Sequence, residues 1–219
     1  MYKVKYLIVA ILVAFSTMTA QSKSALGIQG VYASSTGDLA DIFDSGFGGS
    51  ASFFYNLNDN LQLSATAGYI KFSFNNDYFN DQLKDAGIDA TVDVDATLSV
   101  IPIMVGARYF LSSSNFKPYL LADAGIHIME ITSSKVTVSG QEFDAVGSAS
   151  ESKGAFDIGA GFLVNIAPKI NLDINGKLNL NGLQVKKEKT VSSGSSTTTE
   201  SSESSATFFT VSAGVSFEL

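Results

Sequence analysis

The single histidine of this chain, His127, is the first residue whose chemistry could support catalysis. An imidazole can act as a general base, and in some lipid-hydrolysing and acyl-transferring enzymes a histidine activates a nearby serine. A His-x-Ser pair would place that serine where this sequence has Met129. We therefore predict that His127 is a structural residue paired with a neighbouring carboxylate, and that the chain has no catalytic residues.

Acidic residues crowd one stretch of the sequence, which raises the question of a calcium site. The stretch contains Asp77, Asp81, Asp85, Asp89, Asp93 and Asp95. The common calcium-binding loop places its ligands at fixed positions over about 12 residues, with a central glycine and a final bidentate glutamate. That pattern is missing, so we expect a solvated acidic loop, no bound metal and no cofactor.

The overall composition excludes further classes of chemistry. The chain has no cysteine, which rules out thiolate catalysis and a disulfide framework. Its formal net charge of −7 argues against nucleic acid as a partner, because phosphate backbones need a basic footprint. Charged residues make up 16% of the chain, well below the average of about 25% for soluble proteins. The chain therefore has fewer charged residues than a typical soluble protein.

Alternating hydrophobicity predicts the elements that position the candidate residues. Between Ile170 and Leu180, apolar residues alternate with polar ones, which is the period-two pattern of a β-strand with one dry and one wet face. The same pattern runs from Phe209 to Leu219. It also predicts strands at Ser24–Ala33, Gly46–Leu57, Asn60–Phe74, Thr97–Phe110, Lys117–Ile131 and Gly154–Asn165. The fold class is therefore all-β with eight antiparallel strands.

The connections between these strands fall into two classes. Short links lie at Asn58–Asp59, Ser112–Phe116 and Ala167–Pro168, and long polar links lie at Ser34–Ser45, Asn75–Ala96, Thr132–Lys153 and Leu183–Ala206. Short turns on one rim and long loops on the other are typical of an up-and-down transmembrane β-barrel. We expect a short helix within Asn76–Ile88, where apolar residues have helical spacing, and no folded structure in the Ser- and Thr-rich tract Val191–Ser205.

The first residues have the pattern of a secretory signal peptide. Two lysines precede an apolar run over Tyr6–Phe15, and small residues lead up to Ala20. An apolar run of roughly 10 residues is too short for a membrane helix, which needs about 20. We predict a signal peptide over residues 1–20 and one barrel domain over residues 21–219. No later segment is apolar over such a length, so only strands can cross a membrane.

Alternation alone does not say which face of the barrel is wet, because a soluble lipocalin-like barrel buries its apolar face. The positions of the aromatic residues favour a membrane barrel, since they resemble two interfacial girdles. We assign Tyr55, Tyr109, Phe110, Tyr119 and Phe217 to the short-turn rim and Phe47, Tyr69, Phe72, Phe156, Phe208 and Phe209 to the long-loop rim. The Gly-x-Trp pattern of lipocalins is also missing, since the chain has no tryptophan.

The wet face then becomes the interior of the barrel and carries charges of both signs. The polar network expected there comprises Arg108, Asp123, His127, Asp157, Asp173, Lys177 and Glu218. Such residues either line a narrow pore or fill the interior as a plug. An eight-stranded barrel is just wide enough for its own side chains to fill it, so we expect a plug in which opposite charges pair.

Two strands and the C-terminus resemble the OmpA-like family of bacterial outer-membrane β-barrels, in its small OmpX and opacity-protein form. The resemblance lies in Ile101–Phe110, which has an early proline and a late Gly-x-Arg-Tyr, and in Lys117-Pro118-Tyr119-Leu120 followed by Gly125. The positions Ser212, Gly214, Phe217 and Leu219 resemble the C-terminal signal of such barrels, whose usual last residue is phenylalanine.

The resemblance implies insertion by the barrel-assembly machinery into the outer membrane of a Gram-negative bacterium, with the final strand read as an added edge strand. We expect no peptidoglycan-binding domain, because the sequence ends at Leu219. The expected partners are outer-membrane lipid, lipopolysaccharide and the assembly machinery, and the expected state is a monomer. Lys186, Lys187 and Lys189 either contact lipopolysaccharide phosphates by charge attraction or are simply solvated.

These features predict a non-enzymatic membrane-anchored scaffold. Its four long extracellular loops would serve surface interaction or envelope integrity. The alternative is a narrow channel or a transporter of small hydrophobic molecules in the outer membrane. An enzyme that acts on membrane lipid through His127 is the third possibility.

Overall fold

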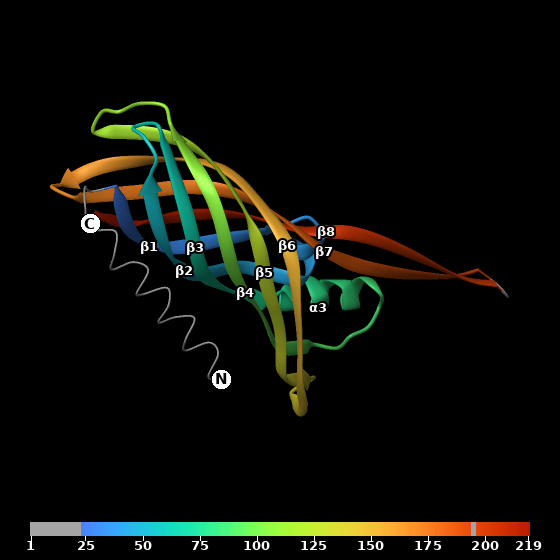
Figure 1. Cartoon of the computed structure of the whole chain (residues 1–219). Coiled ribbons are helices and arrows are strands. Elements are labelled where there is room, and N and C mark those ends of the chain that lie inside the picture. Colours follow the sequence, from blue (N-terminus) through green and yellow to red (C-terminus); the bar gives the residue numbers. More distant parts are fainter. Residues whose placement is uncertain (1–22, 194–195) are drawn as a thin grey trace, which may run out of the picture.

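The computed structural model describes residues 23–193 and 196–219, and within them eight strands form one closed antiparallel barrel (Figure 1). The elements are β1 Ser24–Thr36, α2 Asp38–Ile42, β2 Phe43–Asn56, β3 Leu61–Phe74, α3 Asn76–Asp85, β4 Val92–Phe110, β5 Phe116–Val138, β6 Gln141–Ala167, β7 Ile170–Ser193 and β8 Ser196–Glu218. Each strand pairs with the next, and β1 pairs with β8 to close the wall. The predicted up-and-down barrel is confirmed, whereas the predicted signal peptide over residues 1–20 lies outside the described residues.

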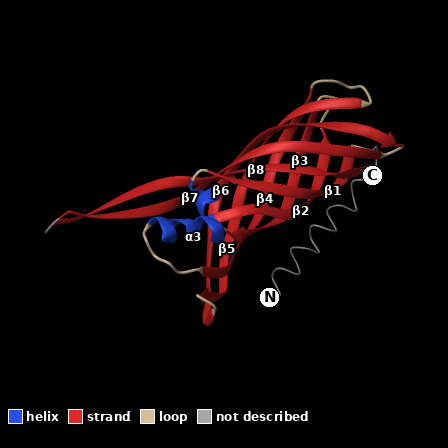
Figure 2. Cartoon of the chain, turned by 180° about the vertical axis from the view of Figure 1, so that it is seen from behind, coloured by secondary structure: helices blue, strands red, loops and turns tan. Residues whose placement is uncertain are grey.

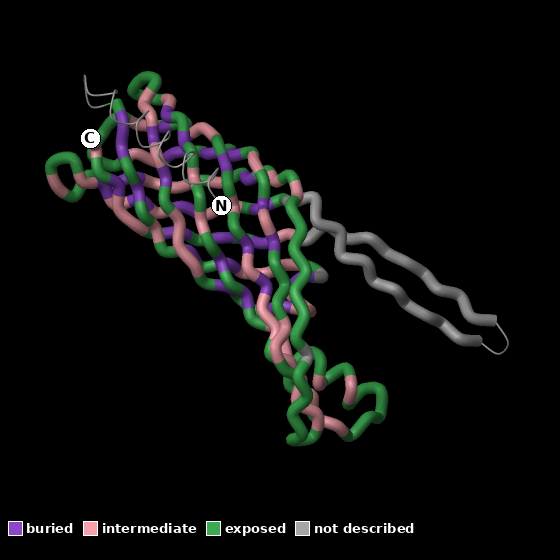
Figure 3. The backbone as a smooth tube through the Cα atoms, turned by 60° about the horizontal axis from the view of Figure 1, so that its bottom comes forward, coloured by how far each residue is buried: buried purple, intermediate pink, exposed green. Residues whose placement is uncertain are grey.

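Buried and exposed residues alternate along the strands of the barrel wall (Figure 3). On β4, Met104 and Arg108 are at most 4% exposed, whereas Val105 and Tyr109 are 64% and 53% exposed. Every second residue along the strands turns outward, and many of these outward residues are large and apolar, so the outer face carries an apolar belt. Such a belt is typical of membrane-spanning barrels. No helix among the described residues is long and apolar enough to span a membrane.

The aromatic girdles are only partly as predicted. Tyr109, Phe217, Phe47, Tyr69, Phe156 and Phe209 are between 41% and 68% exposed. In contrast, Phe110, Tyr119, Phe72 and Phe208 are at most 5% exposed. The girdle assignment was wrong for these four residues, because strand alternation turns them inward. Phe110 directly follows the outward Tyr109, and Phe208 directly precedes the outward Phe209.

The long-loop rim contains more regular structure than the sequence predicts. Helix α3 confirms the short helix expected in the second long link, and α2 adds a single turn in the first. In the third link, β5 and β6 continue as a hairpin to Ser139 and Gly140, which have positive φ values of 48° and 85°. In the fourth link, β7 and β8 pair as far as Ser193↔Ser196. The expectation of no folded structure in Val191–Ser205 was wrong for the described residues of that tract, because backbone pairing between strands needs no apolar face.

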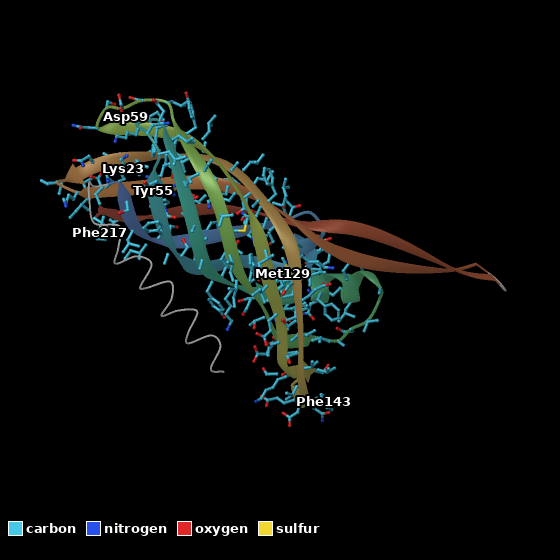
Figure 4. All side chains as sticks on the ribbon, in the orientation of Figure 1. Lys23, Tyr55, Asp59, Met129, Phe143 and Phe217 are labelled. Carbon is cyan, nitrogen blue, oxygen red and sulfur yellow. The ribbon has the colours of Figure 1, made fainter. Side chains whose placement is uncertain are left out.

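The two hairpins leave the same end of the barrel in different directions (Figures 1 and 2). Figure 4 labels Phe143 near the end of the β5–β6 hairpin, and Tyr55, Asp59 and Phe217 at the opposite, short-turn end. Register explains the divergence, since β6 pairs with β7 only from Ala155↔Asn181 toward the short-turn rim. Each hairpin is therefore a separate element on the long-loop rim.

Helix α3 covers the outer edge of the β4 extension. The side-chain amide of Asn80 donates to the carbonyl oxygen of Val92 and its oxygen accepts from the Val92 N–H, both at 2.8 Å. Asn76 makes the same pair of hydrogen bonds with Val94, at 3.3 and 2.8 Å. Two amides one helical turn apart thus imitate a neighbouring strand and satisfy backbone groups at an exposed edge.

Candidate functional site

The interior of the barrel is the candidate site, because the buried charged residues collect there. In its short-turn half, Arg108 on β4 donates from Nη1 to Asp173 Oδ2 on β7 at 2.8 Å. The hydroxyl of Tyr119 on β5 donates to the other carboxylate oxygen of Asp173 at 2.5 Å. The guanidinium of Arg108 also lies 4.1 Å from the ring centroid of Phe54. This pair is shielded from water and joins two strands that are not neighbours in the wall.

A second ion pair lies one layer closer to the long-loop rim. Lys177 on β7 donates from Nζ to Asp123 Oδ2 on β5 at 2.7 Å. The hydroxyl of Ser64 on β3 donates to Asp123 Oδ1 at 3.3 Å. Both charged side chains are at least 85% buried, since 15% of Lys177 and 5% of Asp123 is exposed. The two ion pairs together connect three of the eight strands, β4, β5 and β7.

His127 lies in the interior but makes none of the polar contacts expected of it. The residue is 0% exposed, and neither ring nitrogen has a hydrogen-bond partner among the described residues. Its ring packs against Phe208, with 5.8 Å between the centroids. The predicted carboxylate partner was wrong, because Asp123 on the same face of β5 is engaged by Lys177 and Ser64. Within residues 23–193 and 196–219, neither ring nitrogen of His127 is therefore hydrogen-bonded to a serine or a carboxylate.

Asp157 and Glu218 also lie outside the two ion pairs. Asp157 is 2% exposed and its Oδ1 has no partner among the described residues, and the same holds for both amide atoms of Asn175. Glu218 lies at the short-turn rim, where it accepts a hydrogen bond of 3.2 Å from Asn171. There it borders a polar cavity of about 600 Å³, which Lys23 and Lys117 also line. The seven polar residues predicted from the sequence thus divide between paired, unpaired and rim positions.

The long-loop half of the interior is apolar, which the sequence analysis missed. One cluster of buried side chains fills it: Val31, Ala33, Leu39, Phe43, Ile70, Phe72, Leu98, Val100, Met129 and Phe208. Phe72 and Phe208 meet edge to face with 5.6 Å between their centroids. The signal for this cluster is the loss of alternation in the neighbouring pairs Val100-Ile101, Ile128-Met129 and Phe208-Phe209. Where both residues of such a pair are apolar, both faces of the strand are dry.

The proposed assembly residues lie at the end of β8, the strand that pairs with β1 and β7. Phe217 and Leu219 are 42% and 53% exposed, whereas Ser212 is 4% exposed and faces the interior. A Cβ on Gly214 would lie 2.0 Å from the carbonyl oxygen of Ile28, so no side chain fits there. Barrel packing alone therefore requires glycine at this position.

No metal centre accompanies these residues. In the described part of the chain, no group of three or more histidine or carboxylate residues is placed to hold a metal ion. Two of the acidic residues near α3 have other partners: Asp81 pairs with Lys84 at 3.3 Å, and Asp93 accepts from Asn76 at 3.0 Å. These carboxylates thus stabilise the local structure around α3.

A closed barrel with an apolar outer belt defines an integral membrane protein. The family model of the outer membrane protein beta-barrel domain matches residues 7–217. The chain therefore belongs to this family and lies in the outer membrane, embedded in its lipid. The resemblance to small OmpA-like barrels that the sequence indicates is confirmed.

Two solved structures illustrate the similarity of fold. Neisserial surface protein A is 16% identical over 90% of this chain and 97% of its own, with a TM-score of 0.54. A major outer membrane protein from Thermus thermophilus is 10% identical over 90% of this chain and 99% of its own, with a TM-score of 0.52. At these identities the likeness shows the fold alone. No curated protein matches the chain.

Proposed function

We propose that the barrel is a closed, non-enzymatic anchor that presents its long-loop elements at the cell surface. The observation that carries this proposal is the filled interior. The ion pairs Arg108–Asp173 and Lys177–Asp123 bridge its short-turn half, and the apolar cluster fills its long-loop half. An ion needs a continuous polar path, and both halves interrupt it.

The elements of the long-loop rim support a role in surface interaction or envelope integrity. The β5–β6 hairpin carries Phe143 and Val146, which are 53% and 87% exposed. By its location, this rim is the part of the protein that would contact lipopolysaccharide. The side chains of Lys186, Lys187 and Lys189 lie outside the described residues. The same proposal includes insertion through the barrel-assembly machinery, guided by Ser212, Gly214, Phe217 and Leu219, and a monomeric state.

Planar-bilayer recording tests whether the barrel is closed. We expect the full-length mature protein to give no steady single-channel openings, because two filled layers block the interior. The alternative of a narrow channel predicts steady openings that depend on the lining charges. Openings in the wild-type protein that disappear in Lys177→Met would overturn the closed barrel. The gel-mobility shift of folded barrels on heating should accompany each recording, to show that the protein inserted was folded.

A further inference from the structure

A cavity of about 640 Å³ lies at the long-loop end of the interior, next to the apolar cluster. Helix α2 and the ends of β2 and β3 bound it on one side, and β4, β5 and β6 bound it on the other. The lining includes Leu39, Phe43, Phe74, Leu98, Met129 and Ile131. Among the described residues that line it, Glu151 alone is ionisable. The cavity is therefore an apolar space within a barrel whose other half is polar.

The floor of this cavity is sealed. Leu98 and Met129 belong both to its wall and to the apolar cluster. In the same cluster, Phe72, Val100 and Phe208 are at most 1% exposed. Close-packed side chains thus separate the cavity from the ion pairs deeper in the barrel. A molecule that enters is held there and does not pass through, so a binding site is compatible with a closed barrel.

The lining chemistry restricts what can bind. A charged group among these carbon side chains would lose its hydration without gaining a partner, at a cost of several kcal/mol. On the β6 side of the cavity, however, Glu151 Oε1 lies 2.7 Å from Lys153 Nζ, and both side chains are at least 36% exposed. This ion pair offers hydrogen-bond acceptors and donors to a polar group. The occupant must then be apolar along its length and polar at one end.

The cavity is larger than the smallest apolar ligands need, so a longer apolar ligand fills it better. An engineered cavity of about 150 Å³ lined by leucine, isoleucine and phenylalanine takes up benzene. The present cavity is roughly four times as large and falls within the range of about 300–1,000 Å³ typical of small-molecule sites. We propose that it binds the alkyl chain of a single-chain amphiphile, whose polar end lies at Ser150 and Glu151. This adds a ligand site to the barrel and does not depend on whether the barrel conducts.

Photocrosslinking in lipid nanodiscs tests this site. The full-length mature protein is incubated with dodecanoic acid that carries a diazirine at the methyl end, and the labelled peptides are identified by mass spectrometry. We expect labels on Leu39, Phe43 or Phe74, which line the side of the cavity away from Glu151, and competition by unlabelled dodecanoic acid. The variants Ala96→Trp and Ala149→Trp place an indole in the lining and should lower this labelling about tenfold. Loss of contact with about two methylene groups is sufficient for such a change.

Ala124→Trp is the matched control, because Ala124 is exposed on the outer face of β5. It should label at the same residues and to the same extent as the wild-type protein. All variants must show the heat-dependent gel shift of a folded barrel, and the less buried Ala149 site provides a second variant if Ala96→Trp does not fold. Labels confined to the lipid-facing belt, or unchanged labelling in both indole variants, would overturn the site. Labelling of the same residues by a diazirine-bearing phospholipid, but not by the fatty acid, would assign the cavity to bilayer lipid and overturn the single-chain ligand.

Discussion

The two halves of the barrel interior fill similar spaces in opposite ways. Toward the short-turn rim, Arg108 and Asp173 fill it with charges that are stable only because each has a partner. Toward the long-loop rim, the interior is filled by apolar side chains such as Phe72 and Phe208. Their contribution to stability depends on how completely they fill the space. The comparison shows that the same eight-stranded wall can enclose either paired charges or packed apolar side chains. The two halves should therefore fail under different substitutions.

The largest effect is expected from removing one member of the buried ion pair. In Asp173→Ala, Arg108 stays buried and loses both its ion pair and the carboxylate that also orders Tyr119. Breaking a buried pair in this way costs about 3–5 kcal/mol of unfolding free energy. Urea unfolding of the protein in lipid vesicles measures the loss. The same experiment should show little dependence on salt, because the pair is shielded from solvent.

The double variant Arg108→Met/Asp173→Leu is the control for that loss. It removes both charges and leaves apolar side chains of similar volume, so most of the lost stability should return. A double variant as unstable as Asp173→Ala would mean that the short-turn half depends on shape rather than on charge pairing. The distinction between the two halves would then disappear.

The apolar half should respond in proportion to the volume removed. Phe208→Ala leaves a cavity beside Phe72 and His127 and should cost about 3 kcal/mol. Phe208→Leu removes less volume and should cost about 1 kcal/mol. Urea unfolding of the two variants in the same vesicles gives the comparison. Equal losses of unfolding free energy in the two variants would contradict the view that packing stabilises the apolar half of the interior. They would point instead to a specific role for the aromatic ring beside His127.

The barrel and the residues that line its interior could be predicted from the sequence, because the alternation of apolar and polar residues assigns each residue to one face of its strand. Arg108, Asp123 and Asp173 could be placed in the interior from their position in period-two runs. Their pairing could not be predicted, because it depends on shear between strands that lie far apart in the sequence. Lys177 pairs with Asp123, which is 54 residues away.

The long-loop rim was harder to predict for two physical reasons. Strand extensions such as Thr132–Val138 are held by backbone hydrogen bonds, which leave little trace in the side-chain pattern. The apolar cluster arises where inner and outer faces are both dry, as at Phe208-Phe209, and alternation then vanishes. Phe72 and Phe208 were assigned to the outer girdle because they are aromatic and lie near strand ends. The assignment did not consider whether each residue points into or out of the barrel.

The smallest effect is expected at the edge of the polar half, where Ser64 contributes one hydrogen bond to Asp123. Ser64→Ala removes a donor at 3.3 Å but leaves the 2.7 Å contact with Lys177 intact. The carboxylate therefore keeps its counter-charge, and the loss should be about 1 kcal/mol, the net value of one such bond. Urea unfolding resolves a difference of this size when it is compared with Ser99→Ala, whose hydroxyl contacts Tyr69 on the outer face. A loss as large as that of Asp173→Ala would show that Asp123 depends on every contact it makes, and that the polar half fails as one cooperative network rather than pair by pair.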